Sequence, residues 1–252
     1  MGQRVAMVTG GAQGIGRGIA ELLGSTGYPV AVADLDVDGA AAVAESIVKG
    51  GGSAMPVRMD VTSTASVTGA AAEVENALGP VDVLVNNAGW DDFMPFVATD
   101  EAFWDKILDI DFKGALRVTK EMLPGMIERG WGRVVNIGSD AGRVGSSLEA
   151  VYSGAKGGII AFTKTLARET ATTGVTANTV CPGPTDTPAL RKFADSSGGD
   201  ADKVLVGMTR AVPMRRLATP ADVAAAVAFF ASESTAYITG QTLSVSGGLT
   251  MA

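Results

Sequence analysis

Residues 5–16 read VAMVTGGAQGIG and decide the fold. An apolar run rich in valine ends at Thr9, and a loop with four glycines leads from it into a helical pattern. Glycines permit a tight turn and let the backbone approach a pyrophosphate at the helix N-terminus, where N–H groups and the helix dipole favour an anion. In this strand–loop–helix setting we expect dinucleotide contacts rather than a plain glycine-rich turn. The expected contact residues are Gly10, Gln13, Gly14, Ile15 and Gly16.

Short β-branched or apolar runs alternate with Ala-rich amphipathic segments along the chain. This alternation predicts an α/β fold: one Rossmann-type, doubly wound parallel sheet of about seven strands with helices on both faces. The expected strands are 5–9, 29–34, 54–59, 81–86, 133–139, 175–181 and 242–245. The expected helices are 15–26, 39–49, 63–78, 101–129, 151–173 and 221–231.

No linker or second domain is visible, so residues 1–252 are expected to form one domain for dinucleotide binding and catalysis. The stretch at 185–213 departs from the pattern, because it is polar and lacks a strong period. We expect it to form a flexible flap over the site, inserted before the last helix and strand.

Composition excludes several classes of function. The net charge of −7 argues against nucleic acid as a partner, since phosphate binding needs clustered Lys and Arg. One cysteine and no histidine exclude a disulfide framework and make a structural zinc site, or any other metal site, unexpected. No signal peptide and no bilayer-spanning apolar run are visible, so we expect a cytoplasmic protein that binds no membrane.

Asp34 at the end of the second expected strand bears on the choice of dinucleotide. A carboxylate there can accept hydrogen bonds from both ribose hydroxyls of NAD and repels a 2′-phosphate. Leu35 and Asp36 follow it, and no Lys or Arg lies beside it. Charge therefore favours NAD over NADP, although a capping or turn aspartate is the alternative. For Asp60 and Val61, which follow the third strand, the sequence allows two roles: contact with the adenine, or a turn.

Tyr152 and Lys156 form a Tyr-x-x-x-Lys step, with Ser139 thirteen residues upstream of the tyrosine. This step places the phenol and the ammonium on one helix face, roughly one turn apart. Lys156 then lowers the cost of ionising Tyr152, whose usual pKa is about 10. Each residue alone has a structural interpretation as a buried tyrosine, a solvated lysine or a strand-end serine.

Together these motifs make the chain resemble the short-chain dehydrogenase/reductase family over nearly its whole length. The matching segments are the 9–16 loop, Asn86-Asn87-Ala88-Gly89, Ser139 with Tyr152 and Lys156, and Pro182-Gly183 followed by Thr185 and Thr187. The resemblance implies that Asn87, Ala88 and Gly89 lie beside the adenosine half and that the Pro182–Thr187 loop faces the nicotinamide. It also implies a homotetramer built through segments 101–129 and 151–173.

The family chemistry gives each member of the trio a role. Tyrosinate at position 152 removes the hydroxyl proton while hydride leaves the carbinol carbon for the nicotinamide. Ser139 hydrogen-bonds the substrate oxygen and sets its angle. Lys156 stabilises the tyrosinate and binds ribose hydroxyls.

One position departs from the family pattern. Asp111 stands where the family usually has an asparagine, whose main-chain carbonyl anchors a water that relays protons to the lysine. A carbonyl survives the change, so we expect Asp111 to keep the relay and Asp111→Asn to show a comparable kcat and pH profile. The side-chain amide's donor role is lost unless the carboxyl group is protonated.

Segments 86–91, 139–141, 143–147, 149–152, 180–187 and 244–251 carry a closer resemblance, and several of them flank the expected substrate pocket. They resemble one subgroup, the 2-hydroxycyclohexanecarboxyl-CoA dehydrogenases of benzoate degradation. The resemblance implies oxidation of a ring alcohol beside a CoA thioester, with Trp90, Arg143 and Ser139 as substrate contacts. Trp90 is either a wall for the ring or packing at the sheet edge. The basic residues near the pocket, which suit a polyanionic CoA or an ordinary mixed-charge flap, are Arg143, Arg191, Lys192, Lys203, Arg210, Arg215 and Arg216.

Three other functions remain open from the sequence. Within the same family, the chain could oxidise a free secondary alcohol or sugar, or reduce 3-oxoacyl carrier protein, although Asp34 opposes the NADPH that the latter normally uses. In a different class, it could be a catalytically silent dinucleotide sensor, which the intact Ser139, Tyr152 and Lys156 oppose. Cys181 is expected to be a small buried residue, because no histidine exists to activate it.

Overall fold

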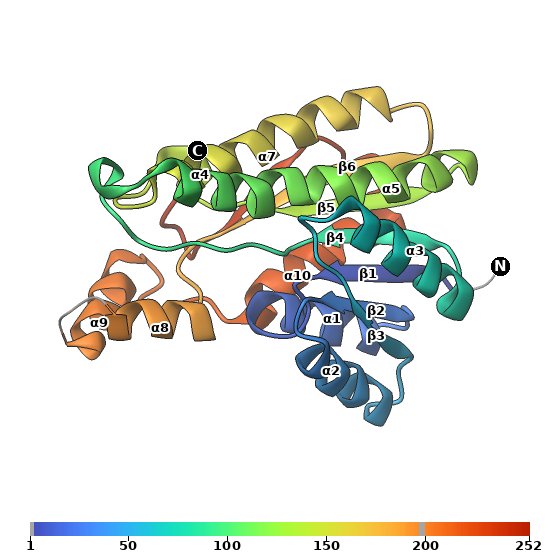
Figure 1. Cartoon of the computed structure of the whole chain (residues 1–252), viewed down its shortest axis with the longest axis horizontal. Helices are drawn as coiled ribbons and strands as arrows, with labels where there is room; N and C mark the ends of the chain where they lie inside the picture. The colour runs from blue at the N-terminus through green and yellow to red at the C-terminus, as the bar shows by residue number, and fades with distance from the viewer. Residues whose placement is uncertain (1–2, 197–199) are drawn as a thin grey trace.

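The computed structural model describes residues 3–196 and 200–252. Seven parallel strands form one sheet in the order β3-β2-β1-β4-β5-β6-β7, with helices on both sides (Figure 1). The strands are β1 Val5–Thr9, β2 Val30–Asp34, β3 Ala54–Arg58, β4 Val81–Asn86, β5 Gly132–Ile137, β6 Val175–Pro182 and β7 Thr242–Val245. The predicted doubly wound parallel sheet is confirmed.

Helices cover the sheet in two layers. The helices are α1 Gly14–Ser25, α2 Val37–Lys49, α3 Thr64–Leu78, α4 Glu101–Ile107, α5 Ala115–Glu128, α6 Ala141–Val144, α7 Ala150–Glu169, α8 Pro188–Ser196, α9 Ala201–Ala211 and α10 Pro220–Ala231. Short turns of other helix types are η1 Phe96–Ala98, the π-helical η2 Leu108–Gly114, and η3 Glu233–Thr235. Helices α1, α2 and α10 pack on one face, and α3, α5 and α7 pack on the other.

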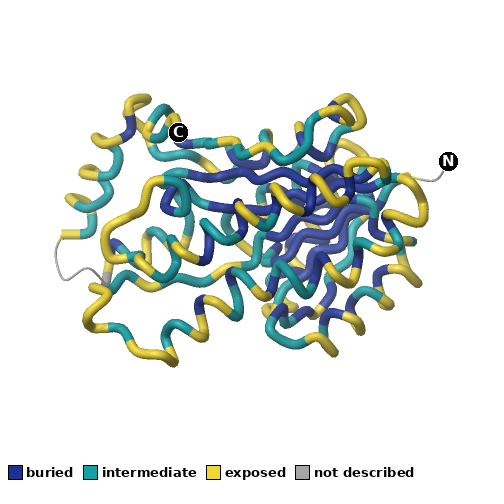
Figure 2. Tube along the Cα trace, turned by 90° about the horizontal axis from the view of Figure 1, so that it is seen from above, coloured by how far each residue is buried: buried dark blue, intermediate teal, exposed yellow. Residues whose placement is uncertain are grey.

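Strand β1 shows why the sheet is buried on both faces. Ala6 and Val8 point into the layer of α1 and α10, whereas Val5 and Met7 point into the layer of α3 and α5. Because successive strand side chains alternate between faces, a strand covered on both sides must be apolar throughout. Figure 2 shows the resulting buried band of strands beneath more exposed helices.

The helix expected at 101–129 is interrupted. It consists of α4, the π-helical turn η2 and α5, so the prediction of one continuous helix was wrong in detail. A π turn inserts one extra residue into the helical register, which rotates the side chains that follow. Here it directs Asp111 into the protein, where the residue is 2% exposed. Nothing in the hydrophobic period reveals such an insertion.

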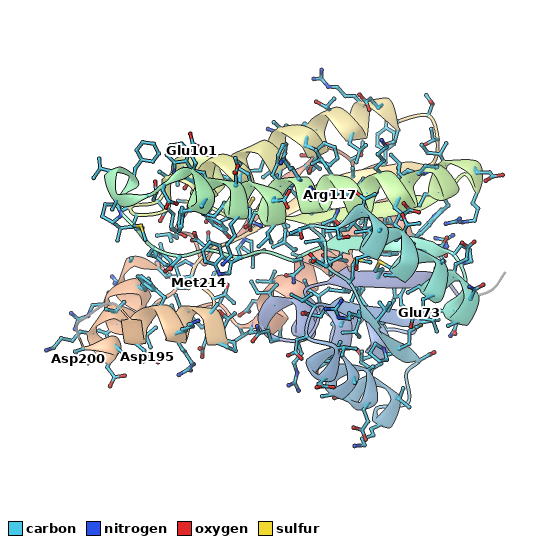
Figure 3. The ribbon with its side chains drawn as sticks, viewed as in Figure 1. Glu73, Glu101, Arg117, Asp195, Asp200 and Met214 are labelled. Carbon is cyan, nitrogen blue, oxygen red and sulfur yellow. The ribbon has the colours of Figure 1, made fainter. Side chains whose placement is uncertain are left out.

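The segment expected to be an irregular flap contains α8 and α9. The prediction missed them because charged residues interleave with short apolar patterns such as Val204, Leu205 and Met208. The ring of Phe193 on α8 stacks on Phe93, with centroids 3.6 Å apart, so the segment lies against the loop after β4. Asp195 and Asp200 project from its outer side (Figure 3). Across residues 3–196 and 200–252, no helix is long and apolar enough to cross a membrane.

Candidate active site

The glycine loop between β1 and α1 has a geometry that other residues cannot reproduce. Gly10 and Gly14 have φ angles of +63° and +55°, in the left-handed region that favours glycine. A Cβ added to Gly16 would lie 2.0 Å from the carbonyl oxygen of Gly10, which no side chain tolerates. The loop therefore brings backbone N–H groups to the start of α1, as an anion-binding loop requires. Gln13, the residue before α1, makes no side-chain cap.

Asn87 ties this loop to the end of β4. Its side-chain amide donates hydrogen bonds to the main-chain carbonyls of Thr9 (2.9 Å) and Gly10 (3.0 Å). The Thr9 hydroxyl in turn accepts from the N–H groups of Asn87 and Ala88, each at 3.0 Å. The role of Thr9 was missed from sequence, although a threonine ending the first strand was a visible signal.

Asp34 lies at the carboxyl end of β2, next to the loop. Its Oδ2 accepts a hydrogen bond from the Ala12 N–H at 2.9 Å, and its Oδ1 accepts from the Asp36 N–H at 3.0 Å. The carboxylate is thus held at the edge where a ribose would lie. Each oxygen keeps a further lone pair for a ribose hydroxyl.

Asp60 and Val61 make the contacts of a turn, one of the two placements considered. Asp60 Oδ1 accepts from both the N–H (2.9 Å) and the hydroxyl (2.7 Å) of Thr62, and these bonds lower the Asp60 pKa. Val61 is buried against Gly114, and its carbonyl accepts from Arg117. Contact of Asp60 or Val61 with adenine stays a prediction.

The loop after β6 returns to the glycine loop. The Gly183 N–H donates to the Val245 carbonyl at 3.1 Å, and the Thr185 hydroxyl donates to the Gly183 carbonyl at 2.9 Å. Thr187 stands beside Gly14, since a Cβ added to Gly14 would lie 3.5 Å from the Thr187 methyl group. The structure therefore gathers Pro182–Thr187 and the loop at one edge of the sheet.

Ser139, Tyr152 and Lys156 meet at this same edge. Tyr152 and Lys156 lie on α7, and Ser139 follows β5. The Lys156 ammonium is 5.4 Å from the centre of the Tyr152 ring and donates to the Ile137 carbonyl at 3.2 Å. Ser139 accepts from the Ala141 N–H at 3.1 Å and shares a hydrogen bond with Tyr152. The spacing argument thus placed all three groups together.

The surroundings of Tyr152 oppose its ionisation. Burial raises the pKa of Tyr152 well above its usual value, and the carboxyl groups of Asp111, Asp91 and Glu149 raise it further. The hydrogen bond with Ser139 acts in the other direction. In the protein alone, Tyr152 is therefore a phenol at neutral pH.

Asp111 forms an ion pair that its sequence position alone did not reveal. Its Oδ1 lies 3.2 Å from the Lys156 ammonium, and its Oδ2 accepts the Trp90 N–H at 3.1 Å. Both members of the pair are buried, at 2% and 4% exposure. The expectation for Asp111 concerned its main-chain carbonyl, whereas the structure places the side-chain carboxylate itself on the lysine.

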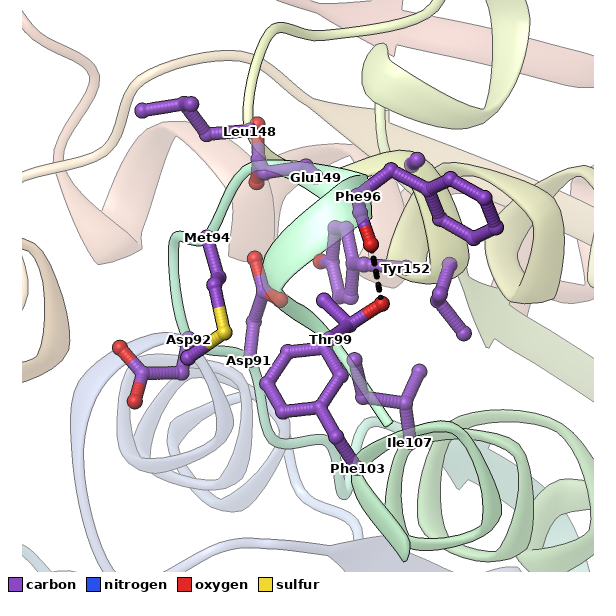
Figure 4. A pocket seen from close by; sticks show the side chains of 12 residues that line it. Asp91, Asp92, Met94, Phe96, Thr99, Phe103, Ile107, Leu148, Glu149 and Tyr152 are labelled. Carbon is purple, nitrogen blue, oxygen red and sulfur yellow. Dashed lines mark hydrogen bonds between the residues drawn. The ribbon is translucent and has the colours of Figure 1, made fainter. Parts of the chain in front are cut away.

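A narrow cavity opens beside Tyr152 (Figure 4). Its walls are mainly apolar, with three acidic side chains among them. Apart from Tyr152, the lining residues are Asp91, Asp92, Met94, Phe96, Thr99, Phe103, Ile107, Leu148, Glu149, Ala150 and Val151. Burial and the neighbouring Glu149 raise the pKa of Asp91 to about 8. Asp91 and Glu149 were not assigned to the site from sequence; their positions beside Trp90 and three residues before Tyr152 were the available signals.

The expected substrate contacts Trp90 and Arg143 are already engaged. The Trp90 ring packs edge-on against Phe103, with centroids 5.7 Å apart, and Lys106 lies 3.4 Å over its centre. Arg143 donates to the Ser244 hydroxyl at 2.7 Å, toward β7. Neither residue is among those that line the cavity beside Tyr152.

Most of the basic residues considered for CoA are paired. Arg191 binds Asp186 (2.8 Å), Lys203 binds Asp200 (3.4 Å), and Arg216 binds Asp222 (2.7 Å). Arg215 donates to the carbonyl of Arg210. These exposed pairs favour the mixed-charge interpretation of the segment.

Neither metal nor cysteine chemistry finds support in the described ranges. No group of three or more metal-binding side chains occurs within residues 3–196 and 200–252. Cys181 is fully buried, and burial raises its pKa to about 12. Such a thiol is a small packed residue, as expected.

Comparison with known proteins agrees with this geometry. A family model described as enoyl-(acyl carrier protein) reductase matches residues 10–250. The chain is 38% identical to nodulation protein G of Azospirillum brasilense, over 99% of both chains. It is also 38% identical to 3-oxoacyl-(acyl-carrier-protein) reductase FabG of Vibrio harveyi, over 98% of both chains.

Solved structures of similar proteins have the same fold. A tryptophan variant of actinorhodin polyketide ketoreductase with NADPH superposes with a TM-score of 0.93 at 37% identity, covering 98% of this chain and 97% of that one. A putative gluconate dehydrogenase from Agrobacterium tumefaciens superposes with a TM-score of 0.92 at 31% identity, covering 98% and 96%. With a matching family model, full-length relatives and the Ser139, Tyr152 and Lys156 group in place, the chain belongs to the short-chain dehydrogenase/reductase family of oxidoreductases.

Proposed function

We propose that the protein is an NAD-dependent oxidoreductase that interconverts a secondary alcohol and a ketone by hydride transfer. One observation carries this proposal: Ser139, Tyr152 and Lys156 converge at the sheet edge that also holds the glycine loop. A catalytically silent sensor would not require this convergence of a hydroxyl, a phenol and a buried ammonium beside the loop.

The residues at this edge fit a dinucleotide. A side chain at Gly10 would collide with Ala88 after β4, and one at Gly16 would collide with the carbonyl of Gly10, so the backbone is bare where a pyrophosphate would approach. Asp34 would accept the adenosine ribose hydroxyls, and Lys156 would bind the nicotinamide ribose. The Pro182–Thr187 loop would lie along the nicotinamide, whose ring supplies or accepts the hydride when bound.

NAD is the dinucleotide that charge favours. The Asp34 carboxylate is fixed by Ala12 and Asp36 at the place where NADP would carry its 2′-phosphate. The ketoreductase that this chain resembles was solved with NADPH, so cofactor choice is specific to the individual protein. Initial rates with NADH and NADPH at equal concentrations test this choice; equal kcat/KM values would contradict it.

The side chains divide the proton chemistry among them. Ser139 donates a hydrogen bond to the substrate oxygen and orients it toward Tyr152. In oxidation the Tyr152 phenolate accepts the hydroxyl proton; in reduction the phenol returns a proton to the same oxygen. The Lys156 ammonium lowers the cost of the phenolate and fixes the ribose.

For the substrate we propose an acyl thioester with its hydroxyl or ketone two carbons from the thioester carbonyl. The candidate is 2-hydroxycyclohexane-1-carboxyl-CoA, oxidised to its 2-oxo thioester, from the resemblance of segments such as 86–91 and 139–147. The relatives named for 3-oxoacyl carrier protein act on the same arrangement of atoms, so reduction of a 3-oxoacyl thioester is the second candidate. Met94, Phe103 and Leu148 line the space beside Tyr152 with apolar side chains, which must move apart to admit a ring or acyl chain, because the cavity has no room for a molecule the size of water.

A substrate panel tests this proposal. Oxidation of 2-hydroxycycloalkane-1-carboxyl-CoA thioesters with NAD⁺ is compared with oxidation of the matching free acids and of a plain cyclic alcohol. We expect kcat/KM to be at least about tenfold higher for the thioesters, since a single well-placed contact discriminates by that amount. Equal values of kcat/KM would remove the thioester from the proposal. Turnover of free alcohols or sugars alone would favour a dehydrogenase of free secondary alcohols or sugars.

We also propose a homotetramer, assembled through the outward faces of α4–α5 and α7, as the family resemblance implies. Leu108 and Ile127 are large apolar side chains exposed along the first of these segments. Light scattering coupled to size exclusion gives the mass directly. A monomer of 25.5 kDa would contradict the proposal.

A further inference from the structure

The Lys156 ammonium has a buried negative partner. Asp111 Oδ1 lies 3.2 Å from it, with the Asp111 side chain fully shielded from solvent and that of Lys156 5% exposed. A second donor, the Trp90 N–H, reaches the other carboxylate oxygen at 3.1 Å. Burial raises the pKa of Asp111 above its usual value, and the contacts with Lys156 and with the Trp90 N–H act against this by favouring the ionised carboxylate. In its ionised form, Asp111 offsets the positive charge that would stabilise a Tyr152 phenolate.

The backbone holds Asp111 in this position. The residue lies in the π-helical turn η2, which directs its side chain inward, and Gly89 is packed against the carboxylate. A Cβ added to Gly89 would lie 2.7 Å from Asp111 Oδ1 and 3.4 Å from the Lys156 ammonium. Only a bare backbone fits this close to the pair.

Two further acids face Tyr152 from other elements. Asp91 follows β4 and Glu149 precedes α7, and both line the cavity beside the phenol. The Met94 N–H donates to the Leu148 carbonyl at 2.9 Å, which fastens their two loops together. Lys156 and three carboxyl groups, Asp111, Asp91 and Glu149, thus act on the phenol, and Asp91, whose pKa is raised to about 8, is charged only above that pH.

We propose that Asp111 is an electrostatic positioning residue that offsets the charge of Lys156 and thereby keeps Tyr152 in its phenol form. The phenol is the form that donates a proton, so the resting site is ready for ketone reduction at neutral pH. Alcohol oxidation needs the phenolate and sets in only at more alkaline pH. This inference rests on the proposed function for its consequence in catalysis, but its electrostatic core does not.

Burial and the three carboxyl groups all raise the pKa of Tyr152 and so favour its phenol form. Burial contributes most to the raised pKa of Tyr152, and Asp111 is the strongest of the charged contributors, ahead of Asp91 and Glu149. Replacing Asp111 by asparagine keeps the shape of the side chain and removes its charge. Lys156 is then free to act on the phenol as it would beside an uncharged neighbour.

The direct test is an alkaline titration of tyrosinate absorbance. The signal of Tyr152 is isolated by subtracting the titration of each protein's Tyr152→Phe form. We expect Asp111→Asn to move the Tyr152 titration to lower pH by about one unit. The control is Asp109→Asn in the same turn, where the carboxylate pairs with Arg117 at 2.6 Å instead of with Lys156. It should leave the Tyr152 titration unchanged.

The pH profiles of turnover give the second readout. The rise of alcohol oxidation with pH should move down by about one unit in Asp111→Asn, and the decline of ketone reduction should move with it. This replaces the comparable pH profile expected from the sequence, because the structure places the Asp111 carboxylate against Lys156. If Asp111→Asn does not fold, as judged by circular dichroism, Asp111→Ser is titrated instead and should shift Tyr152 in the same direction.

Superimposable tyrosinate titrations for Asp111→Asn and the parent would overturn the inference. A titration that shifts in a protein that turns over no alcohol or ketone would support the electrostatic inference while removing the proposed function. Conversely, turnover with unshifted titrations would keep the proposed function and discard the role of Asp111.

Discussion

Asp34 Oδ2 accepts the N–H of Ala12 at 2.9 Å, so the end of β2 and the glycine loop hold each other in place. The same carboxylate carries the charge that we propose selects NAD over NADP.

Asp34→Asn tests the selection of NAD over NADP. The change keeps the side-chain oxygen for Ala12 but removes the negative charge that faces a 2′-phosphate. We expect NADP(H) binding to strengthen and NAD(H) binding to weaken. The ratio of the two Kd values should change by about tenfold to a hundredfold, which is the effect of losing one hydrogen bond to a charged group. Fluorescence titration with both reduced dinucleotides measures this; an unchanged ratio of Kd values would contradict the assignment.

Gly16→Ala should abolish dinucleotide binding. A methyl group at this position lies 2.0 Å from the Gly10 carbonyl oxygen and 2.5 Å from the Asn87 amide, so the loop or α1 must move. We expect a loss of several kcal/mol of unfolding free energy, in the range of overpacked or strained sites. Gly69→Ala on the exposed face of α3 is the matched control, because nothing lies within 4 Å of its added Cβ. That variant should gain about 0.5–1 kcal/mol, and chemical denaturation compares the two.

Tyr152→Phe should remove turnover and keep NAD binding. Only the phenol oxygen is lost, and with it the group that exchanges a proton with the substrate. A general acid or base contributes about a hundredfold to ten-thousandfold, so kcat should fall at least that far. Tyr237→Phe, at a fully exposed tyrosine, controls for the loss of a phenol elsewhere. Turnover within tenfold of the parent would exclude Tyr152 as the proton-transfer group.

The stability of the protein should fall as pH rises from about 5 to 8. The pKa of Asp91 is raised to about 8 in the folded protein by burial and by Glu149, well above its usual value of 3.8. Between these two pKa values the folded state holds a proton that the unfolded state has already released. The stabilisation that this proton gives the folded state is lost as pH rises through the folded pKa. Asp91→Asn should flatten this pH dependence and be more stable than the parent at pH 8 by about 1 kcal/mol or more. Melting temperatures across this range measure it, and parallel curves for the two proteins would refute it.

The strands and the loop could be predicted because their signals are local. The run from Val5 to Val8 is apolar at every position, since both of its faces are covered, and the glycines after Thr9 mark a turn that other residues cannot adopt. The Tyr152/Lys156 step also survives into the structure, because a helix fixes the relation of residues four apart.

Other features depended on contacts between distant segments. The π turn that directs Asp111 toward Lys156 adds one residue to the helical register without a mark in the hydrophobic pattern. The pairing of Arg143 with Ser244 joins residues 101 positions apart, so a basic side chain near the pocket in sequence faces β7 instead. Helices α8 and α9 were missed because their short apolar patterns are interrupted by charges.

The sequence by itself determined the parallel sheet, the dinucleotide loop and the trio of Ser139, Tyr152 and Lys156, because period and local backbone geometry specify each of them. Only the tertiary structure decided the electrostatic setting of that trio. Asp111, Asp91 and Glu149 come from three separate segments, and their charges act on Tyr152 through space within a buried site. Such an interaction depends on distance and burial, which no local pattern records.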